Sequence, residues 1–201
     1  MSQYGKAKEL NTKPLMVCAL KIETQGQLDD YNVLYTGVGK VNATYELVNH
    51  LVKMQDLPKL IINYGTAGSR KVKKKTLVDC TKFVQRDMDV TGLGFMRGET
   101  PFELDPPLML DFGITPLNNI KRRATCGSGD SFVEDRTQYY GEVVDMEAYA
   151  LAKVCYLKDV PFVSFKYITD GADEQAHEDW EANLADGIVV FKEKVLNEVK
   201  G

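Results

Sequence analysis

Short segments rich in apolar residues recur along the chain and predict strands, of which the continuous runs at 15–20, 60–64 and 162–168 predict buried ones. The segments lie at residues 15–20, 31–36, 60–64, 122–127 and 162–168, and residues 76–84 predict one or two further strands. Apolar residues at helical spacing predict helices from about residue 42, from about residue 148 and at the C-terminal end, where the stripe is Trp180, Leu184, Ile188, Phe191 and Val195. Strands alternating with helices predict an α/β fold, a three-layer αβα sandwich around a mixed, largely parallel sheet.

The length of the chain bounds its domain organisation. It has 201 residues, which suits one large domain, and neither an internal repeat nor a linker divides it. We therefore expect a single domain over residues 1–201, with residues 1–14 forming a flexible polar N-terminus. Residues 100–119 hold four prolines and little periodicity, so this segment is predicted to be a loop over the surface.

Small or acidic residues follow the predicted strands, at Glu23, Gly37, Gly65, Gly127 and Asp170. In open α/β sheets, ligands bind outside the carboxyl ends of the strands, so these ends are expected to converge on one pocket. Glu147 adds a further acid at the start of a predicted helix. On position alone, surface acids remain the alternative interpretation of these carboxylates.

Charge and composition exclude several classes of function. The net charge of −4 gives no basis for nucleic-acid binding, and the basic run at residues 71–75 is interpreted as a solvated loop. No apolar run is long enough to span a bilayer, so no membrane partner is expected. The four cysteines are far apart in the sequence, as in reduced proteins of the cytoplasm. With two histidines in the chain, a His-rich zinc site is not expected, and the acids of residues 87–95 lack the spacing of a calcium loop.

Taken together, the strand ends resemble those of the nucleoside phosphorylase and nucleosidase superfamily. Within it, the sequence is most similar to the branch of 5′-methylthioadenosine/S-adenosylhomocysteine nucleosidases. The resemblance rests on stretches that occur in the family's order, namely CALKIE (18–23), TGVGKVNA (36–43), NYGTAGS (63–69), DMDVTGLGF (87–95), SGDSFV (128–133), VDMEAYALAKVCY (144–156) and ITDGADEQAH (168–177). One such motif is weak evidence, whereas the ordered set covers nearly the whole chain.

The resemblance implies hydrolysis of the N-glycosidic bond of a purine nucleoside. Asp170 resembles the acid that protonates the purine at N7, and Glu23 resembles the carboxylate that activates the attacking water. Met146 and Glu147 resemble the pair that holds the ribose. For this chemistry Asp170 must carry a proton near neutral pH, and burial would raise its pKa in that direction. Glu147 is expected to stay ionised and to favour the cationic sugar.

Further residues take binding roles from the same resemblance. Phe132 and Val133 resemble residues that stack on the base and bond its edge through the backbone. Gly68, with Thr66 nearby, matches a small loop beside the sugar. Trp180 falls where the family places an aromatic residue over the 5′ substituent. The chemistry needs no metal or other cofactor, and the family implies a homodimer whose partner chain helps to close the 5′ pocket.

The chain departs from the family's pattern at several positions. Thr66 and Thr169 stand where serine is usual, Lys166 where arginine is, and Asp145 where glutamate is. These exchanges keep the hydroxyls and charges. Residues 100–119 match poorly, which leaves the cover of the pocket undefined.

Two other functions stay open at the level of sequence. A phosphate-dependent purine nucleoside phosphorylase would need arginines to hold phosphate, and the candidates are Arg70, Arg86, Arg97 and Arg136. The anionic Glu23 would repel phosphate, which favours hydrolysis. A non-catalytic nucleoside-binding protein is the other alternative, although such a protein needs neither a water activator nor a proton donor. The preferred base and 5′ substituent are not defined by the sequence.

Overall fold

A computed structural model describes residues 14–113, 120–138 and 140–197. The predicted flexible N-terminus lies outside the described residues apart from its last residue. The strands are β1 (Leu15–Cys18), β2 (Val33–Tyr35), β3 (Ile61–Gly68), β4 (Leu77–Gln85), β5 (Met109–Asp111), β6 (Arg123–Ser128), β7 (Val143–Asp145) and β8 (Phe162–Asp170). The α-helices are α1 (Lys21–Thr24), α2 (Lys40–Leu51), α3 (Ala148–Leu157) and α4 (Ala176–Phe191), and a π-helical turn (Lys192–Leu196) extends α4.

The strands form one mixed sheet, as predicted. Its order is β2-β1-β3-β7-β6-β4-β5, and β8 pairs with both β3 and β4. Strands β1, β2, β3 and β8 are parallel to one another, whereas β4 runs antiparallel to β8 and parallel to β6. Because β7 joins β6 to β3, the pairings β3-β8-β4-β6-β7-β3 close into a ring. The carboxyl ends of β3 and β8 therefore lie at the rim of a closed, strongly coiled part of the sheet.

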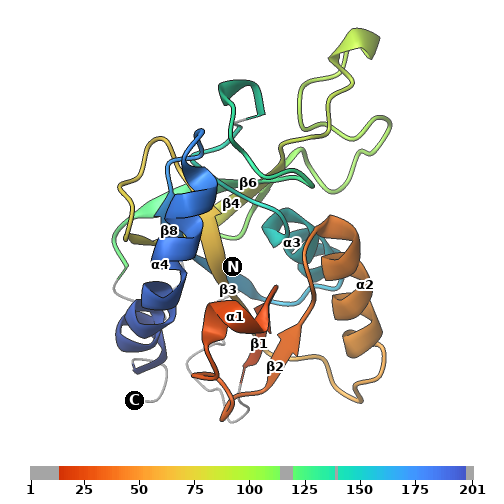
Figure 1. Ribbon diagram of the computed structural model, residues 1–201. Coiled ribbons are helices and arrows are strands. Elements are labelled where there is room, and N and C mark those ends of the chain that lie inside the picture. The colour runs from red at the N-terminus through yellow and green to blue at the C-terminus, as the bar shows by residue number, and fades with distance from the viewer. Residues whose placement is uncertain (1–13, 114–119, 139, 198–201) are drawn as a thin grey trace.

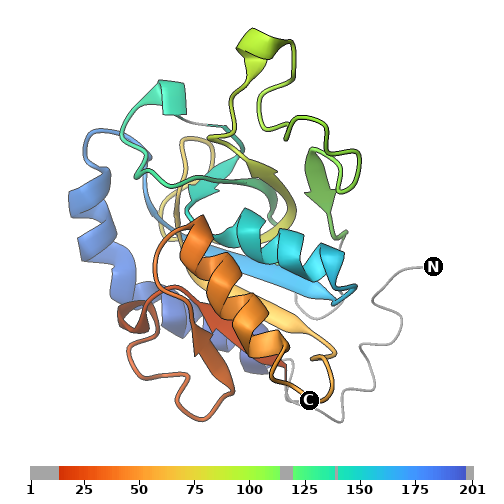
Figure 2. The same cartoon turned by 90° about the vertical axis from the view of Figure 1, so that its right-hand side faces the viewer.

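Side chains alternate along the strands and build a core on each side of the sheet. In β1, Leu15 and Val17 join the cluster under α2 and α3, whereas Met16 and Cys18 join the cluster under α4. Figures 1 and 2 show the resulting layers, with α2 and α3 together on one face and α4 on the other. This is the predicted αβα arrangement.

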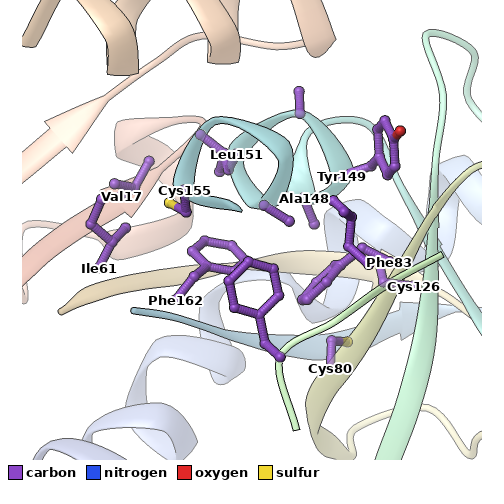
Figure 3. Close-up of a cluster of buried hydrophobic side chains, with 14 of the residues drawn as sticks. Val17, Ile61, Cys80, Phe83, Cys126, Ala148, Tyr149, Leu151, Cys155 and Phe162 are labelled. Atoms are coloured by element: carbon purple, nitrogen blue, oxygen red, sulfur yellow. The ribbon is translucent and has the colours of Figure 1, made fainter. Parts of the chain in front are cut away.

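Aromatic and aliphatic side chains fill the core beneath α3. The Phe162 ring lies 5.4 Å from the Phe83 ring and meets it edge-on, a preferred aromatic geometry. Leu151 and Cys155 of α3 lie over the strands in the same cluster (Figure 3). This packing fixes α3, and with it the carboxylate that precedes the helix.

Several details of the sequence prediction were wrong or incomplete, and neither strand β7 nor helix α1 was predicted. The third strand does not end at Tyr64: β3 continues through Gly65 and Thr66 to Gly68, because each of these residues still pairs with β8. The last strand runs to Asp170 instead of stopping at Ile168. The predicted loop at residues 100–119 contains the edge strand β5, which pairs with β4, and its residues 114–119 lie outside the described part of the chain.

The helices that the structure describes include none that is both long and apolar enough to cross a bilayer.

Candidate active site

A pocket of about 270 Å³ opens at the rim of the sheet, beside the carboxyl ends of β3 and β8. It brings together every residue assigned to the site from the sequence, namely Glu23, Thr66, Gly68, Phe132, Val133, Met146, Glu147, Asp170 and Trp180. Its wall also contains Asp145 and His177, which received no site role from the sequence, and Arg86, which was considered only as a phosphate ligand. Of the predicted strand ends, Gly37, Gly65 and Gly127 are not part of this wall.

Glu23 is held firmly at the end of β1. Its Oε1 accepts hydrogen bonds from the Thr66 amide and the Thr66 hydroxyl, each at 2.9 Å. Its Oε2 accepts one from the Leu20 amide at 3.1 Å, so the carboxylate also satisfies the free N–H at the start of α1. Glu23 is buried, and these three donors fix its orientation at the pocket wall.

Asp170 is the last residue of β8 and is also buried. Burial raises the pKa of its carboxyl, and the nearby Asp173 and Asp179 add to the shift. Hydrogen bonds from the Ala172 amide (2.9 Å) and the Thr169 hydroxyl (2.8 Å) oppose it without reversing it. The pKa therefore moves in the direction that the sequence analysis predicts for a proton donor.

Gly68 faces Asp170 across the β3–β8 pairing. A Cβ at position 68 would overlap the Asp170 carboxyl and crowd Ala172 at 3.2 Å. Only glycine leaves the acid in place, which accounts for the small residue predicted beside the sugar.

Glu147 immediately precedes α3, at the helix start where the sequence analysis put it. Its Oε1 accepts a hydrogen bond of 2.8 Å from the Gly39 amide, and the side chain is buried. Burial and the neighbouring Asp145 raise the pKa of Glu147 to about 8, although Lys166 and the Gly39 amide pull it down. This raised pKa contradicts the expectation that Glu147 stays ionised at neutral pH.

Asp145 and Lys166 form an ion pair in the interior, 2.7 Å apart, with side chains 1% and 2% exposed. Asp145 also accepts hydrogen bonds from the Ser128 hydroxyl (2.5 Å) and the Ala148 amide (2.9 Å). Burial by itself would raise the pKa of Asp145, but Lys166 and the hydrogen bonds outweigh it and lower the pKa. Sequence reasoning noted these positions only as exchanges within the family's pattern, although a lysine inside the apolar run 162–168 is a signal for a buried partner.

Arg86 anchors the loop that carries Phe132 and Val133. Its guanidinium is buried and donates to the carbonyl oxygens of Gly129 (3.0 Å) and Ser131. It also donates to the Ser131 hydroxyl at 3.1 Å. Sequence reasoning considered this arginine only as a phosphate ligand and missed its role in shaping the loop.

Val133 is buried against Val144 and Ala172, whereas Phe132 is 41% exposed. The loop thus offers one fixed apolar wall and one aromatic face that is open to a ligand.

Asp87, the first acid of residues 87–95, takes part in ion pairing, whereas Asp89 accepts hydrogen bonds from Thr91. Asp87 accepts a hydrogen bond from the Lys40 ammonium at 2.5 Å and another from the Asp130 amide at 2.9 Å. Asp130 in turn accepts one from the Lys40 amide at 2.7 Å. This network ties the start of α2 to the loop before Phe132. Among the residues that the structure describes, no group of three or more His, Cys, Asp or Glu side chains is placed to hold a metal ion.

Two side chains of α4 reach the pocket. Trp180 is half-buried, and its indole N–H donates a hydrogen bond of 3.0 Å to the Thr66 hydroxyl. His177 lies one turn earlier, with its side chain 68% exposed. Trp180 was assigned to the site from the sequence, but its hydrogen bond was not foreseen.

Comparison with known proteins gives a consistent result. The family model described as "Phosphorylase superfamily" matches residues 23–196. A 5′-methylthioadenosine/S-adenosylhomocysteine nucleosidase of Haemophilus influenzae (strain PittEE) is 35% identical over 177 residues, covering 77% of this chain and 74% of that protein. The nucleosidase of the same name from Bacillus velezensis is 30% identical over 216 aligned residues, covering 98% of this chain and 91% of that protein.

Solved structures share the fold at lower identity. A mutant Helicobacter pylori nucleosidase with 5′-methylthioadenosine in its active site has a TM-score of 0.76 and 21% identity, covering 88% of this chain and 94% of that one. The futalosine hydrolase of Helicobacter pylori has a TM-score of 0.78 and 19% identity, covering 96% of this chain and 98% of that one. At these identities the likeness concerns the fold.

Proposed function

The chain belongs to the phosphorylase superfamily and, within it, to the 5′-methylthioadenosine/S-adenosylhomocysteine nucleosidase family, and from this premise we propose that it hydrolyses the N-glycosidic bond of a purine nucleoside. The substrates we propose are 5′-methylthioadenosine and S-adenosylhomocysteine, the two nucleosides given in the relatives' names. The products are then adenine and the corresponding 5-thio-substituted ribose.

The observation that carries the proposal is that Glu23 of α1 and Asp170 of β8 both contact β3. Thr66 binds Glu23, and Gly68 faces Asp170, so both carboxylates are attached along the same face of β3. Their attachment points are two residues apart, about 7 Å along an extended strand. Both carboxyl groups line the same pocket, where one can act as the acid and the other as the base of glycosidic cleavage.

Asp170 acts as the proton donor in this proposal. Breaking the bond between C1′ and N9 leaves negative charge on the purine, and a proton delivered to N7 neutralises it. The raised pKa of Asp170 favours the protonated carboxyl from which that proton comes. The Thr169 hydroxyl and Ala172 amide orient the carboxyl and then stabilise the anion left after transfer.

Glu23 takes the proton of the attacking water. Its Oε1 already accepts two hydrogen bonds, which uses both lone pairs, whereas Oε2 accepts one among the described residues. Oε2 is thus the atom with capacity for the water's proton. The water oxygen bonds to C1′ as the C1′–N9 bond breaks. Solvent then restores the proton on Asp170 and removes the one on Glu23.

Glu147 is proposed to bind the ribose hydroxyls, beside Met146. Two hydroxyl donors would add to the single Gly39 amide and lower the raised pKa, so substrate binding would favour the ionised carboxylate. A negative charge formed only with substrate bound can stabilise the cationic sugar of the transition state.

Phosphorolysis is the alternative, and the hydrogen bonds of the arginine in the pocket wall argue against it. Arg86 is the arginine among the described residues of that wall, and both its terminal nitrogens donate to backbone carbonyl or hydroxyl oxygens. The two-pronged fork that arginine offers to phosphate is therefore in use. Arg97, which is not part of that wall, donates from Nε to the Arg86 carbonyl and from a terminal nitrogen to the Thr137 carbonyl.

The test is the release of adenine from 5′-methylthioadenosine by the purified protein, measured by chromatography with and without phosphate. We expect a rate that is independent of phosphate and free 5-methylthioribose as product. Glu23→Gln should stop the reaction, because an amide cannot accept the water's proton. Formation of a sugar 1-phosphate, or a rate that saturates with phosphate, would establish the phosphorylase instead.

A homodimer and a cytoplasmic location complete the proposal. Exposed apolar side chains on α2 and on the loop before β5 support association with a second chain, since Val41 is 77% and Phe102 91% exposed. The free, buried cysteines support a reducing compartment. Light scattering of the purified protein tests the dimer, and a monomeric mass at assay concentration would contradict it.

A further inference from the structure

Trp180 and Glu23 are joined by a continuous chain of hydrogen bonds through Thr66. The Trp180 indole N–H donates to the Thr66 hydroxyl at 3.0 Å, and this hydroxyl donates to Glu23 Oε1 at 2.9 Å. The three side chains come from α4, β3 and α1, so these hydrogen bonds connect three elements of the pocket wall.

The direction of this chain is fixed by chemistry. An indole nitrogen can only donate, so the Thr66 oxygen must accept from Trp180. The hydroxyl then has one proton to give, and Glu23 Oε1 is the acceptor within reach. In a chain of aligned hydrogen bonds each bond polarises the next, so the indole strengthens the bond from Thr66 to the carboxylate. Phenylalanine could fill the same space but could not donate.

We propose that Trp180 is a positioning residue for Glu23, acting through the hydroxyl of Thr66. It holds Oε1 in place so that Oε2 stays directed to the water. This inference rests on the proposed hydrolysis, because only there does Glu23 act as a base. It also gives Trp180 a part in turnover that is separate from contact with the 5′ substituent. Because Trp180 belongs to a helix and Glu23 to the first turn after β1, the relay ties α4 to the catalytic carboxylate.

Kinetics of four variants test the relay. Trp180→Phe keeps the ring and removes the donor, and we expect kcat for 5′-methylthioadenosine to fall about threefold to tenfold, the size of one net hydrogen bond, with KM changed less than twofold. Thr66→Val removes the hydroxyl and should lower kcat at least as much. Thr66→Ser restores the hydroxyl and should return kcat to within about twofold of wild type.

The double variant decides between positioning and packing. If Trp180 acts through Thr66, Trp180→Phe should have no further effect on kcat in the Thr66→Val background. Independent roles would instead make the two losses multiply. Multiplying losses, or a Trp180→Phe effect confined to KM, would overturn the inference. Circular dichroism and thermal melting of each variant identify any that fails to fold.

A second readout does not depend on turnover. Trp180 is the single tryptophan of the chain, so intrinsic fluorescence reports this residue alone. Thr66→Val should shift its emission, and Thr66→Ser should not. Glu23→Gln should also shift the emission in the wild-type background but not in the Thr66→Val background.

The fluorescence result separates the two proposals. A protein that cleaves no nucleoside, with or without phosphate, would refute the proposed function, while the emission shifts would still support the relay. Identical emission of wild type and Thr66→Val would refute the relay even in an active enzyme. An emission shift from Glu23→Gln that persists without the Thr66 hydroxyl would do the same, because it would act through space.

Discussion

Asp145 and Glu147 are two residues apart and both are buried, yet the pKa values of their carboxyl groups are shifted in opposite directions. Asp145 accepts from the Lys166 ammonium, the Ser128 hydroxyl and the Ala148 amide, and its pKa is lowered. Glu147 accepts from one amide among the described residues, and its pKa rises to about 8. Burial is therefore similar in the two cases, and the partners decide the charge.

The same difference separates two regions of the molecule. Asp145 borders the pocket but its side chain is 1% exposed and paired with Lys166, so this buried pair is satisfied without a ligand. In the pocket, Glu147 and Asp170 lack a direct cation partner among the described residues, and the pKa of each is raised. Buried carboxyl groups with raised pKa values are destabilising unless a ligand supplies hydrogen bonds to them. This is the physical reason for placing the chemistry in the pocket.

The strongest test of the pocket region is Asp170→Asn. The amide keeps the shape but has no proton to give, so kcat should fall about 10²–10⁴-fold. Asp186→Asn, at an exposed carboxyl outside the pocket wall, is the matched control and should retain activity. Chromatographic release of adenine measures both. A rate for Asp170→Asn within threefold of wild type would move the proton donor to another residue.

Lys166→Met tests the interior region and should be the largest single loss of stability. It leaves Asp145 buried without its cation, which typically costs about 3–5 kcal/mol. The double variant Lys166→Met with Asp145→Asn removes both charges and should recover much of that loss, measured by urea unfolding. Equal losses in the single and double variants would mean that packing, and not the unpaired charge, carries the effect.

The sequence was informative where the physics is local. Largely apolar runs located β1, β3 and β8, because strands covered on both faces carry few polar residues, such as the paired Lys166. The small residues that follow Tyr64 predict the end of the strand, but pairing with β8 extends β3 to Gly68. The edge strand β5 is short and follows prolines, so no periodicity marks it.

The site was predictable in its members but not in its electrostatics. The family's motifs named the pocket residues one by one. The protonation of Glu147, by contrast, depends on distances to Asp145 and Lys166, and the link between Trp180 and Thr66 spans 114 positions of sequence. No local pattern encodes contacts of that kind.

Glu147→Gln tests the raised pKa of Glu147 through the pH dependence of the free energy of unfolding. The carboxyl titrates near its ordinary pKa of 4.5 when unfolded and near 8 when folded. Between these values the unfolded state releases a proton that the folded state keeps, so this group lowers the free energy of unfolding as pH rises. Over pH 6 to 8 the variant should gain about 2 kcal/mol relative to wild type, measured by urea unfolding. If the difference in the free energy of unfolding between variant and wild type stays constant across that range, Glu147 is ionised at neutral pH.

The smallest effect is expected for an ion pair at the surface. The basic run at residues 71–75 was interpreted as solvated, yet the Lys75 ammonium lies 3.1 Å from the Asp186 carboxylate of α4. Both side chains are more than half exposed, at 58% and 56%, so water and salt screen the attraction. A double-mutant cycle of Lys75→Met and Asp186→Asn should give a coupling below about 1 kcal/mol that shrinks further in 1 M salt. The same cycle at Lys166 and Asp145 should give several times more and respond little to salt, because burial excludes the screening ions. Similar couplings at the two sites would remove burial as the reason that one ion pair matters and the other does not.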